Sequence, residues 1–412
     1  MWSERKSNGW LVAELILAGI FIWYVSDRFL VDFYTYTQPK GFDVSHTYRI
    51  KLNNRTGKNP TVTPEEENIS ETESLLLLMQ RIRQLPEVEN CSASYFSCFY
   101  SRGDARRNLV VDNGETGDVN AEYNYRRVTP EFFGLSRIYS ENGETIDISN
   151  LPYNAVVLTS DLRDKLFPDK NATGKTVYRL NGADTVRYTI VAVTTPIRNT
   201  EYEKNDPCIF ECMLGPTLTD NIKQFGAARA ELLIRIKPEA DHNFTDIFTK
   251  RMGERLTVNK LYVSGIEPVT KMREVKLNGY WNQQKTELSL FGFVLLNIFF
   301  GIIATFWLHT GYRQEEIGLR MALGANRSTL FKMLFTEGLC LLGATVLPVV
   351  IIALNIVYTD YMDTFRMPFT IWRFLAGLAI AYGLMFIMIA LGIWYPARSA
   401  SRLKPVDALR YE

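Results

Sequence analysis

The chain has 412 residues, and its 46 basic residues nearly balance its 45 acidic ones. This balance provides no strongly basic surface, so nucleic acid is not expected among the partners. The three histidines, His46, His242 and His309, are scattered and do not have the spacing of zinc ligands, so no metal site is expected.

Four apolar segments are long enough to span a bilayer, which takes about 20 mostly apolar residues in a helix. They are Trp10 to about Leu30, Leu288–Leu308, Leu330–Tyr358 and Trp372–Trp394. The first follows two basic residues, as in a signal peptide, but Trp23, Tyr24 and Phe29 occupy the positions where a cleavage site needs small residues. We therefore interpret it as a retained membrane helix.

Basic residues gather on one side of these four spans. They are Arg5 and Lys6 before the first span, Arg313, Arg320 and Arg327 between the second and third, and Arg398, Arg402, Lys404 and Arg410 after the fourth. The connection between the third and fourth spans has Arg366, with Asp360 and Asp363 beside it. Because loops rich in Lys and Arg stay in the cytoplasm, both termini are expected there and residues 45–284 outside.

The outer segment contains two strand–helix–strand patterns that are far apart in sequence. The first covers residues 47–53, 72–85 and 88–100, and the second covers 231–237, about 241–256 and 261–269. Pro86 stops the first helix, and Asp241 is the expected N-cap of the second. Two such βαβ units can pair into a split ferredoxin-like sheet with helices on one face.

The segment between these two units, about 103–226, is rich in short strands and turns and is predicted to be an inserted β-rich subdomain. The predicted fold class is therefore a membrane protein with four transmembrane α-helices and an α+β extracytoplasmic domain. That domain combines a split βαβ, porter-like part with the β-rich insert. Residues Val269–Glu287 and Asp27–Tyr36 are helix-compatible and are expected to extend the second and first spans outward as stalks.

Four of the five cysteines lie in the outer domain, at Cys91, Cys98, Cys208 and Cys212. In an oxidising compartment an even number suggests disulfides, with three possible pairings. The local pairs Cys91–Cys98 and Cys208–Cys212 are the simplest. One uninterrupted strand would, however, place Cys91 and Cys98 on opposite faces. Cys340 lies in the third span, where packing is its expected role.

Residues 171–176 read NATGKT and end like a phosphate-binding loop. That motif requires a glycine five residues before Gly174, where this chain has Asp169. The segment is also expected outside the cytoplasm, away from ATP. We therefore expect no nucleotide-binding loop in this chain, so an ATPase that drives it would be a separate polypeptide.

Polar residues within membrane spans are functional candidates by default. In this chain they are Glu14, Asn297, Glu337 and Asn355. Glu14 and Glu337 lie about 6–10 Å from the cytoplasmic ends of their spans at 1.5 Å per residue. For both we favour packing at a subunit interface over a transport role. Small residues that allow close helix approach are Gly301, Gly343, Gly377 and Gly383.

The loop after the second span reads RQEEIGLRMALGANRSTLFKMLFTEG from Arg313 to Gly338. It resembles the cytoplasmic coupling segment of MacB/FtsX-type ABC transporter permeases. Ile317 and Met321 share one face of a short helix, and Gly324 is a natural stop before a cap at Asn326 or Ser328. The resemblance implies that this helix seats in a groove on an ATPase. The contact residues would be Glu315, Glu316, Ile317, Gly318, Arg320, Met321, Ala322, Leu323 and Gly324.

The C-terminus, YPARSASRLKPVDALRYE, is similar to the terminal motif of the same family. The matching residues include Pro396, Arg398, Pro405, Leu409 and Arg410. Basic residues there can also anchor the fourth span at anionic headgroups. Weaker matches occur in the outer domain at 125–135, 154–168 and 171–194.

The resemblance implies a non-catalytic permease of the bacterial inner membrane that works by mechanotransmission. It also implies an ABC ATPase subunit that binds ATP and Mg²⁺, so this chain itself needs no cofactor, and a second copy or a homologous permease. Efflux through a periplasmic adaptor and an outer-membrane channel is the leading hypothesis. The alternatives are a lipoprotein-release permease, a regulator of cell-wall hydrolases and a non-transporting sensor.

The expected layout has nine segments. They are a cytoplasmic tail (1–9), the first span and stalk (10–44), the periplasmic core (45–268), the stalk and second span (269–308), the coupling segment (309–329), the third span (330–358), a short periplasmic loop (359–371), the fourth span (372–394) and a cytoplasmic tail (395–412).

Overall fold

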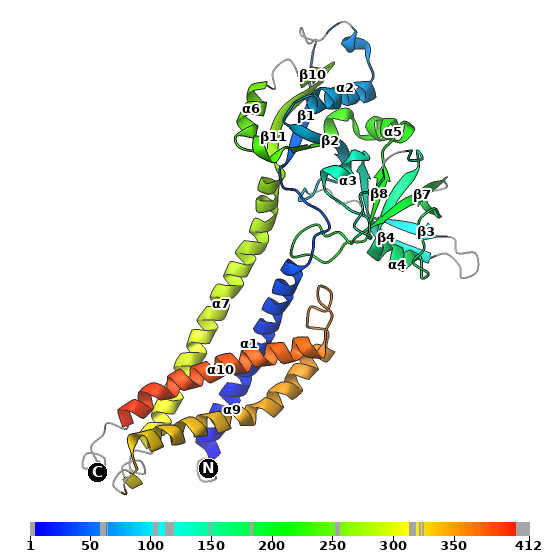
Figure 1. Ribbon diagram of the computed structural model, residues 1–412. Coiled ribbons are helices and arrows are strands. Elements are labelled where there is room, and N and C mark those ends of the chain that lie inside the picture. The colour runs from blue at the N-terminus through cyan, green and yellow to red at the C-terminus, as the bar shows by residue number, and fades with distance from the viewer. Residues whose placement is uncertain are drawn as a thin grey trace. The chain divides into compact units, whose positions relative to one another are not determined.

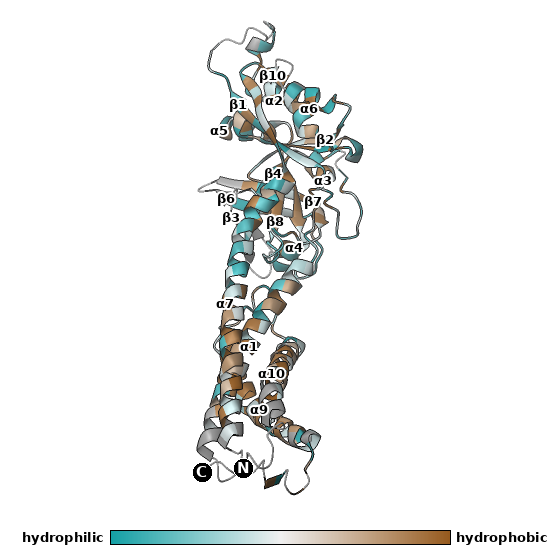
Figure 2. Ribbon diagram, turned by 90° about the vertical axis from the view of Figure 1, so that its left-hand side faces the viewer, coloured by the Kyte–Doolittle hydropathy of each residue, from teal (hydrophilic) through white to brown (hydrophobic). Residues whose placement is uncertain are grey.

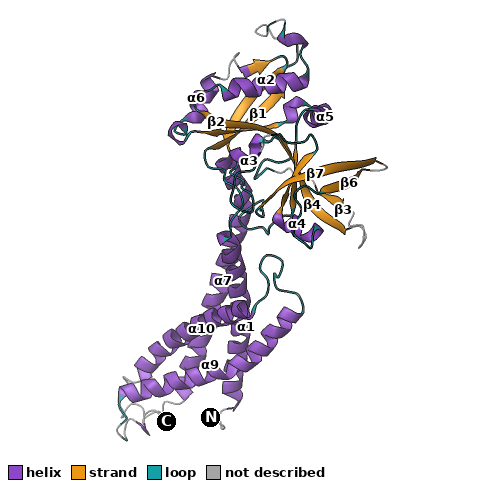
Figure 3. Ribbon diagram, turned by 45° about the vertical axis from the view of Figure 1, so that its right-hand side comes forward, coloured by secondary structure: helices purple, strands orange, loops and turns teal. Residues whose placement is uncertain are grey.

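The computed structural model of the protein forms two units, a helical unit of Met1–Thr37 and Trp281–Glu412 and a globular unit of Gln38–Tyr280. Strands occur in the globular unit, and the described residues of the helical unit form helices and loops (Figure 3). The structure describes residues 5–57, 63, 65–101, 106–111, 119–147, 150–181, 184–251, 256–312, 319–320, 323 and 325–400.

The helical unit contains four long helices (Figure 1). They are α1 (Arg5–Thr37), α7 (Val269–Tyr312, whose first turns belong to the globular unit), α9 (Arg327–Tyr358) and α10 (Ile371–Ala400). Three helical segments among the described residues are long and apolar enough to cross a membrane: Val269–Thr305, Phe331–Tyr358 and Ile371–Trp394. Hydropathy colouring shows apolar residues along α9, α10 and the later turns of α7, whereas the first turns of α7 are hydrophilic (Figure 2). The second, third and fourth predicted spans therefore correspond to described helices.

Helix α1 has 33 residues, which is enough to span, but it does not join the three segments that qualify by composition. Glu14, Asp27, Arg28 and Asp32 interrupt its apolar sequence. The first span therefore stays a prediction, although the predicted helix over it and its extension through Tyr36 are both present.

The core of the helical unit lies between α1, α9 and α10. Its buried side chains include Leu15, Ile22 and Trp23 of α1, Ala353 of α9, and Ala381, Met385 and Ile389 of α10. Helix α9 begins where the sequence predicts a cap, because the Asn326 side chain accepts a hydrogen bond of 2.9 Å from the Thr329 amide.

The first half of the globular unit confirms the split βαβ pairing. Its strands are β1 (Thr47–Asn54), β2 (Val88–Tyr95), β9 (Glu231–Ile236), β11 (Leu261–Pro268) and the short β10 (Thr257–Val258). They lie in the order β10-β11-β1-β9-β2, and β1 is antiparallel to both β9 and β11. Numbering β1, β2, β9 and β11 as 1 to 4 gives the order 4-1-3-2, as in two interleaved βαβ units.

Helices α2 (Glu71–Arg83) and α6 (Phe244–Arg251) pack in one apolar cluster with this sheet. Helix α2 begins with a capping box between Ser70 and Glu73. The second helix differs from the prediction, because it starts at Phe244 and Asp241 does not cap it. Asp241 instead accepts hydrogen bonds from the Tyr48 hydroxyl at 2.5 Å and pairs with His46 Nδ1 at 2.7 Å.

The strand predicted over residues 88–100 is also shorter than expected, since β2 ends at Tyr95. Phe96 and Tyr100 have positive φ values of 53° and 61°, which no strand accommodates. The chain therefore turns away from the sheet before Cys98, and the faces of Cys91 and Cys98 are not set by strand alternation.

The insert is β-rich, as predicted. It contains β3 (Arg106–Val111), β4 (Val119–Val128), β5 (Ala155–Thr159), β6 (Thr176–Asn181), β7 (Asp184–Thr194) and β8 (Cys208–Cys212), with helices α3 (Glu131–Leu135), α4 (Ser160–Leu166) and α5 (Pro216–Phe225). The pairing order β4-β3-β6-β7-β5-β8, with β8 paired back to β4, closes these six strands into a ring. The ring continues the first sheet through the β2–β4 pairing.

Candidate functional site

Most of the predicted coupling segment lies outside the described residues. This holds for Glu315, Glu316, Ile317, Gly318, Met321, Ala322 and Gly324. Of the two described members, Leu323 is 80% exposed and Arg320 donates a hydrogen bond toward the Met333 sulfur. An exposed leucine within this segment is compatible with a partner-binding role, which stays a prediction.

The C-terminal motif is described only in part. The backbone of Pro396 and Arg398 belongs to the end of α10. Pro405, Leu409 and Arg410 lie outside the described residues. The predicted role of this motif therefore stays a prediction.

The intramembrane polar residues take different positions. Glu14 of α1 is half-buried against α7, where it accepts a hydrogen bond of 3.4 Å from the Thr305 hydroxyl. Asn297 and Asn355 are exposed, and each amide donates to the carbonyl four residues earlier, at 2.7 and 2.8 Å. Such local bonds satisfy an amide in lipid without a partner helix. Glu14 therefore contacts a helix of its own chain, and Glu337 is half-buried on α9. Packing of either residue at a subunit interface stays a prediction.

Two of the four predicted small-residue contacts occur. A side chain at Gly301 would collide with the Glu14 carboxylate, and one at Gly377 would press on the Trp23 indole at 3.2 Å. Gly343 and Gly383 have open space around them. These two close approaches lie where α1 meets α7 and α10.

All five cysteines are free thiols. Cys208 and Cys212 stand at the two ends of β8, about 13 Å apart at 3.3 Å per residue, which is too far for a disulfide. Cys91 packs in the cluster under α2 and α6, whereas Cys98 packs in a different cluster with Cys208 and Cys212. Neither predicted local disulfide is therefore present. Cys340 is exposed on α9.

Residues 195–207 form a loop of the globular unit that binds the segment of chain directly following α1. Arg198 is 2% exposed and donates to the backbone carbonyls of Gln38 and Pro39, the latter at 3.2 Å. Its own amide donates to the Lys40 carbonyl at 3.1 Å. Gly41 is tight against the Pro196 carbonyl, so a larger residue there would displace the loop. We call residues 195–207 the clamp loop.

The clamp loop also holds the start of α7. Glu201 is buried and accepts hydrogen bonds from Arg273 Nε of α7 at 2.6 Å, the Tyr100 hydroxyl at 2.9 Å and Lys40 Nζ at 3.3 Å. Burial alone would raise the pKa of Glu201, but the Arg273 bond and the other donors outweigh burial and lower it. Glu201 is thus a buried anion on which Arg273 of α7 and Lys40 of the other connection converge.

Tyr280, two turns further along α7, adds a second contact with the clamp loop. Its hydroxyl donates to Glu203 at 2.8 Å, and its ring stacks on Tyr202 at a centroid distance of 5.7 Å. Stacked aromatic pairs contribute about 0.5–1.5 kcal/mol beyond buried area. The clamp loop therefore contacts α7 at two positions along the helix, Arg273 and Tyr280.

Replacing Glu201 by glutamine should weaken the attachment of the start of α7 to the clamp loop by about 1.5–3 kcal/mol near neutral pH. This is the usual value for hydrogen bonds to a charged group. Because the folded pKa lies below the ordinary 4.5, the carboxylate contributes fully above pH 4.5 and progressively less as pH falls through the folded value. Hydrogen exchange of the 269–280 peptide in the full chain would measure this. Equal exchange in both proteins at pH 7 would contradict it, and the difference should shrink in acid.

A second polar cluster lies in the helical unit. Asp27 of α1 and Arg373 of α10 form a fully buried ion pair with contacts of 2.6 and 2.7 Å. Arg373 also donates to the carbonyls of Asp363 and Met367 in the connection between α9 and α10. This guanidinium therefore ties α1, α10 and the connecting loop together.

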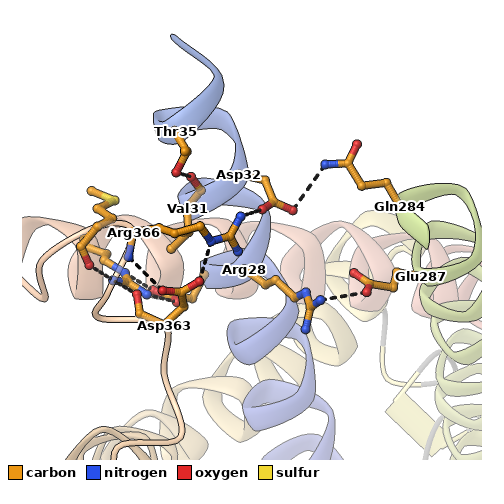
Figure 4. Close-up of polar contacts among 11 residues, drawn as sticks. Arg28, Val31, Asp32, Thr35, Gln284, Glu287, Asp363 and Arg366 are labelled. Atoms are coloured by element: carbon orange, nitrogen blue, oxygen red, sulfur yellow. Dashed lines mark hydrogen bonds and ion pairs between the residues drawn. The ribbon is translucent and has the colours of Figure 1, made fainter. Parts of the chain in front are cut away.

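Next to this pair, Arg366 joins the same loop to α1 (Figure 4). Its guanidinium contacts Asp32 of α1 at 2.6 Å and Asp363 at 2.5 Å. Arg28 and Asp32 also connect α1 to α7. Arg28 pairs with Glu287 at 2.7 Å, and Asp32 accepts a hydrogen bond from Gln284 at 3.5 Å. Burial would raise the pKa of Asp363, but the hydrogen bonds from Arg366 lower it.

Sequence reasoning missed this cluster as a site. In the sequence Asp27 marks only the start of a predicted stalk, and Arg366 is only a charge in the connection between the third and fourth spans. The available signal was the presence of four charges, Asp27, Arg28, Asp32 and Arg373, at or near the outer ends of predicted spans, since charges there are usually paired. Neither cluster is arranged for metal chemistry, and no group of three or more His, Cys, Asp or Glu side chains in the described part of the chain is placed to hold an ion.

The loop that resembles a phosphate-binding motif has a local structural role. Lys175 pairs with Asp169 at 2.9 Å and lies over the Phe167 ring at 5.0 Å. Its ammonium group is thereby engaged on the surface of the insert.

Two family models match the chain and together cover most of it. A MacB-like periplasmic core domain matches residues 35–243, and an FtsX-like permease C-terminal domain matches residues 288–405. The first of these alone spans half of the chain.

Curated relatives are similar over most of the chain. The macrolide export ATP-binding/permease protein MacB of Neisseria meningitidis is 24% identical over 293 residues, covering 68% of this chain and 42% of that protein. MacB of Salmonella typhimurium is 24% identical over 306 residues, covering 72% and 44%. The chain thus spans less than half the length of these relatives.

Among solved structures, the periplasmic region of MacB from Actinobacillus actinomycetemcomitans aligns with a TM-score of 0.34 and 12% identity. That alignment covers 57% of this chain and 94% of that one. The extracellular domain of the noncanonic ABC-type transporter YknZ from Gram-positive bacteria aligns with a TM-score of 0.28, covering 53% and 100%.

Proposed function

The chain belongs to the MacB/FtsX-type family of ABC transporter permeases, and from this membership we propose that it works by mechanotransmission. In this proposal a separate ATPase hydrolyses ATP in the cytoplasm, and the permease carries the resulting movement to its periplasmic domain. The moved domain then drives efflux of a drug, peptide or similar molecule through an adaptor and an outer-membrane channel.

The observation that carries this proposal is the clamp loop. The same short loop binds both connections between the units, the 38–41 segment through Arg198 and the start of α7 through Glu201. Helix α7 then continues without a break from Val269 to Tyr312. A displacement of α7 along or about its axis would therefore reach the globular unit through a short set of buried, charge-assisted contacts.

The finer layout belongs to the same proposal. Helix α1 acts as the first of four transmembrane spans, both termini lie in the cytoplasm, and residues 313–324 seat on the ATPase. The polar cluster formed by Asp27, Asp32, Arg366 and Arg373 supports α1 as a span. The side chains of the Asp27–Arg373 ion pair are 3% and 0% exposed, so α1 packs closely against α10 at this pair.

The rival functions differ in their partners rather than in this geometry. A lipoprotein-release permease, a regulator of cell-wall hydrolases and a sensor would share the membrane helices. Efflux remains the leading proposal, because the outer domain matches a MacB-like periplasmic core domain and the curated relatives are named as macrolide export proteins.

The test is purification of the full chain from native membranes with a photo-crosslinker at Leu323, which is exposed within the proposed coupling segment. We expect an ABC ATPase as the main adduct, together with a periplasmic adaptor. The matched control carries the crosslinker at exposed Leu347 in the middle of α9 and should yield no ATPase. An ATPase recovered with lipoprotein carriers or wall hydrolases would favour lipoprotein release or hydrolase regulation over efflux. Recovery of no ATPase from either site would contradict the proposed coupling role of residues 313–324.

A further inference from the structure

Helices α1 and α7 meet through polar contacts at two levels. At one level the Glu14 carboxylate packs directly against Gly301, which has no side chain, and accepts a hydrogen bond from the Thr305 hydroxyl. At the other, Arg28 pairs with Glu287 at 2.7 Å. All of these residues belong to the helical unit.

The two levels have the same spacing on both helices. Glu14 and Arg28 are 14 residues apart, and so are Glu287 and Gly301. Fourteen residues make about four helical turns and about 21 Å, so the two contacts fall on one face of each helix. The helices therefore run antiparallel with one fixed register. Phe21, halfway between Glu14 and Arg28, contacts Phe291 of α7 at a centroid distance of 6.0 Å.

Apolar packing alone does not specify this register. Only 6% of the apolar window of α7 is buried within the chain, compared with 28% for α9 and for α10. Ile302 packs against Gly392 of α10, but lipid tails can replace contacts of this kind. A polar contact is different, because the carboxylate finds few other partners in the bilayer.

We propose that Glu14 is a positioning residue that sets α7 on α1, with its carboxylate seated in a notch formed by Gly301 and the Thr305 hydroxyl. The Arg28–Glu287 pair adds a more exposed contact at the other end of the same seam. This inference rests on the proposed function for its consequence: α7 carries movement to the clamp loop only while its register on α1 is held.

The notch predicts how substitutions will behave. Glu14→Gln keeps an oxygen that accepts from Thr305, so it should preserve the register. Glu14→Leu removes the acceptor, and Gly301→Ala fills the notch from the α7 side. Because alanine favours a helix over glycine, Gly301→Ala tests the notch without weakening α7 itself.

The first readout is disulfide trapping of Phe21→Cys with Phe291→Cys in the full chain, in a Cys340→Ala background because that thiol is exposed. Interhelical hydrogen bonds in membranes correspond to about a 3- to 18-fold change in the docked population. Glu14→Leu and Gly301→Ala should lower the trapping rate by that order, and Glu14→Gln should restore it. Asn297→Leu, at an exposed amide that bonds only its own helix backbone among the contacts described, is the matched control and should not change it.

The second readout is the ATP-dependent change in hydrogen exchange of the globular unit in the reconstituted permease–ATPase complex. Unchanged trapping in both Glu14→Leu and Gly301→Ala would overturn the positioning role, whatever the transport result. Reduced trapping with an unaltered ATP response would uphold the positioning role and contradict mechanotransmission through α7.

Discussion

Replacing Arg373 by methionine is expected to destabilise the helical unit by about 3–5 kcal/mol, the usual result of removing one partner of a buried ion pair. The substitution leaves the Asp27 carboxylate 3% exposed and without its guanidinium. It also removes the donor that reaches the carbonyls of Asp363 and Met367. The free energy of unfolding in mixed detergent micelles, titrated with dodecyl sulfate, would measure the loss.

The matched control for this experiment is Arg28→Met. Its ion pair with Glu287 has side chains 44% and 32% exposed, so its loss should change stability by less than about 1 kcal/mol. Asp27→Asn combined with Arg373→Met should recover part of the loss, because no charge remains buried. If Arg373→Met were as mild as Arg28→Met, the ion pair would not hold α10 to α1 as described.

A proline at Asn278 should disconnect the two units functionally. Asn278 is exposed on α7, close to where the helix passes from the globular unit to the helical unit. Proline there removes the hydrogen bond to the Glu274 carbonyl and costs about 3 kcal/mol or more, which favours a kink. We expect the ATP-dependent change in hydrogen exchange of the globular unit to disappear, while ATP hydrolysis by the partner continues.

Asn278→Ala serves as the control for the proline variant, because alanine keeps the backbone hydrogen bond and favours the helix. It should leave the ATP response intact. A normal response in Asn278→Pro would mean that movement reaches the globular unit by another route, such as the 38–41 segment held by Arg198.

The helices and the split sheet could be predicted because their signals are local. Apolar runs define the spans, and alternating strands followed by capped helices define the two βαβ units. The errors were local as well. Asp241 looks like a cap in sequence, but Tyr48 of β1 and His46, just before β1, engage it in the fold. The strand after α2 stops early because Phe96 takes a left-handed conformation.

The polar clusters could not be derived in the same way, because their partners are far apart in sequence. Asp27 and Arg373 are separated by 346 positions, and Asp32 and Arg366 by 334. A single sequence shows that such charges near a membrane need partners but does not show which ones. The clamp loop carries still less signal, since nothing in residues 195–207 indicates that Arg198 will be buried.

The insert leaves and rejoins the split sheet at one place, because Ser94 near the end of β2 pairs with Glu231 at the start of β9. In principle a tight turn could join these two strands, which makes the insert a separable module. Yet the clamp loop lies within it, between β7 and β8. An exchange of this module between relatives would therefore alter both the surface of the globular unit and its contacts with the start of α7 in a single evolutionary step.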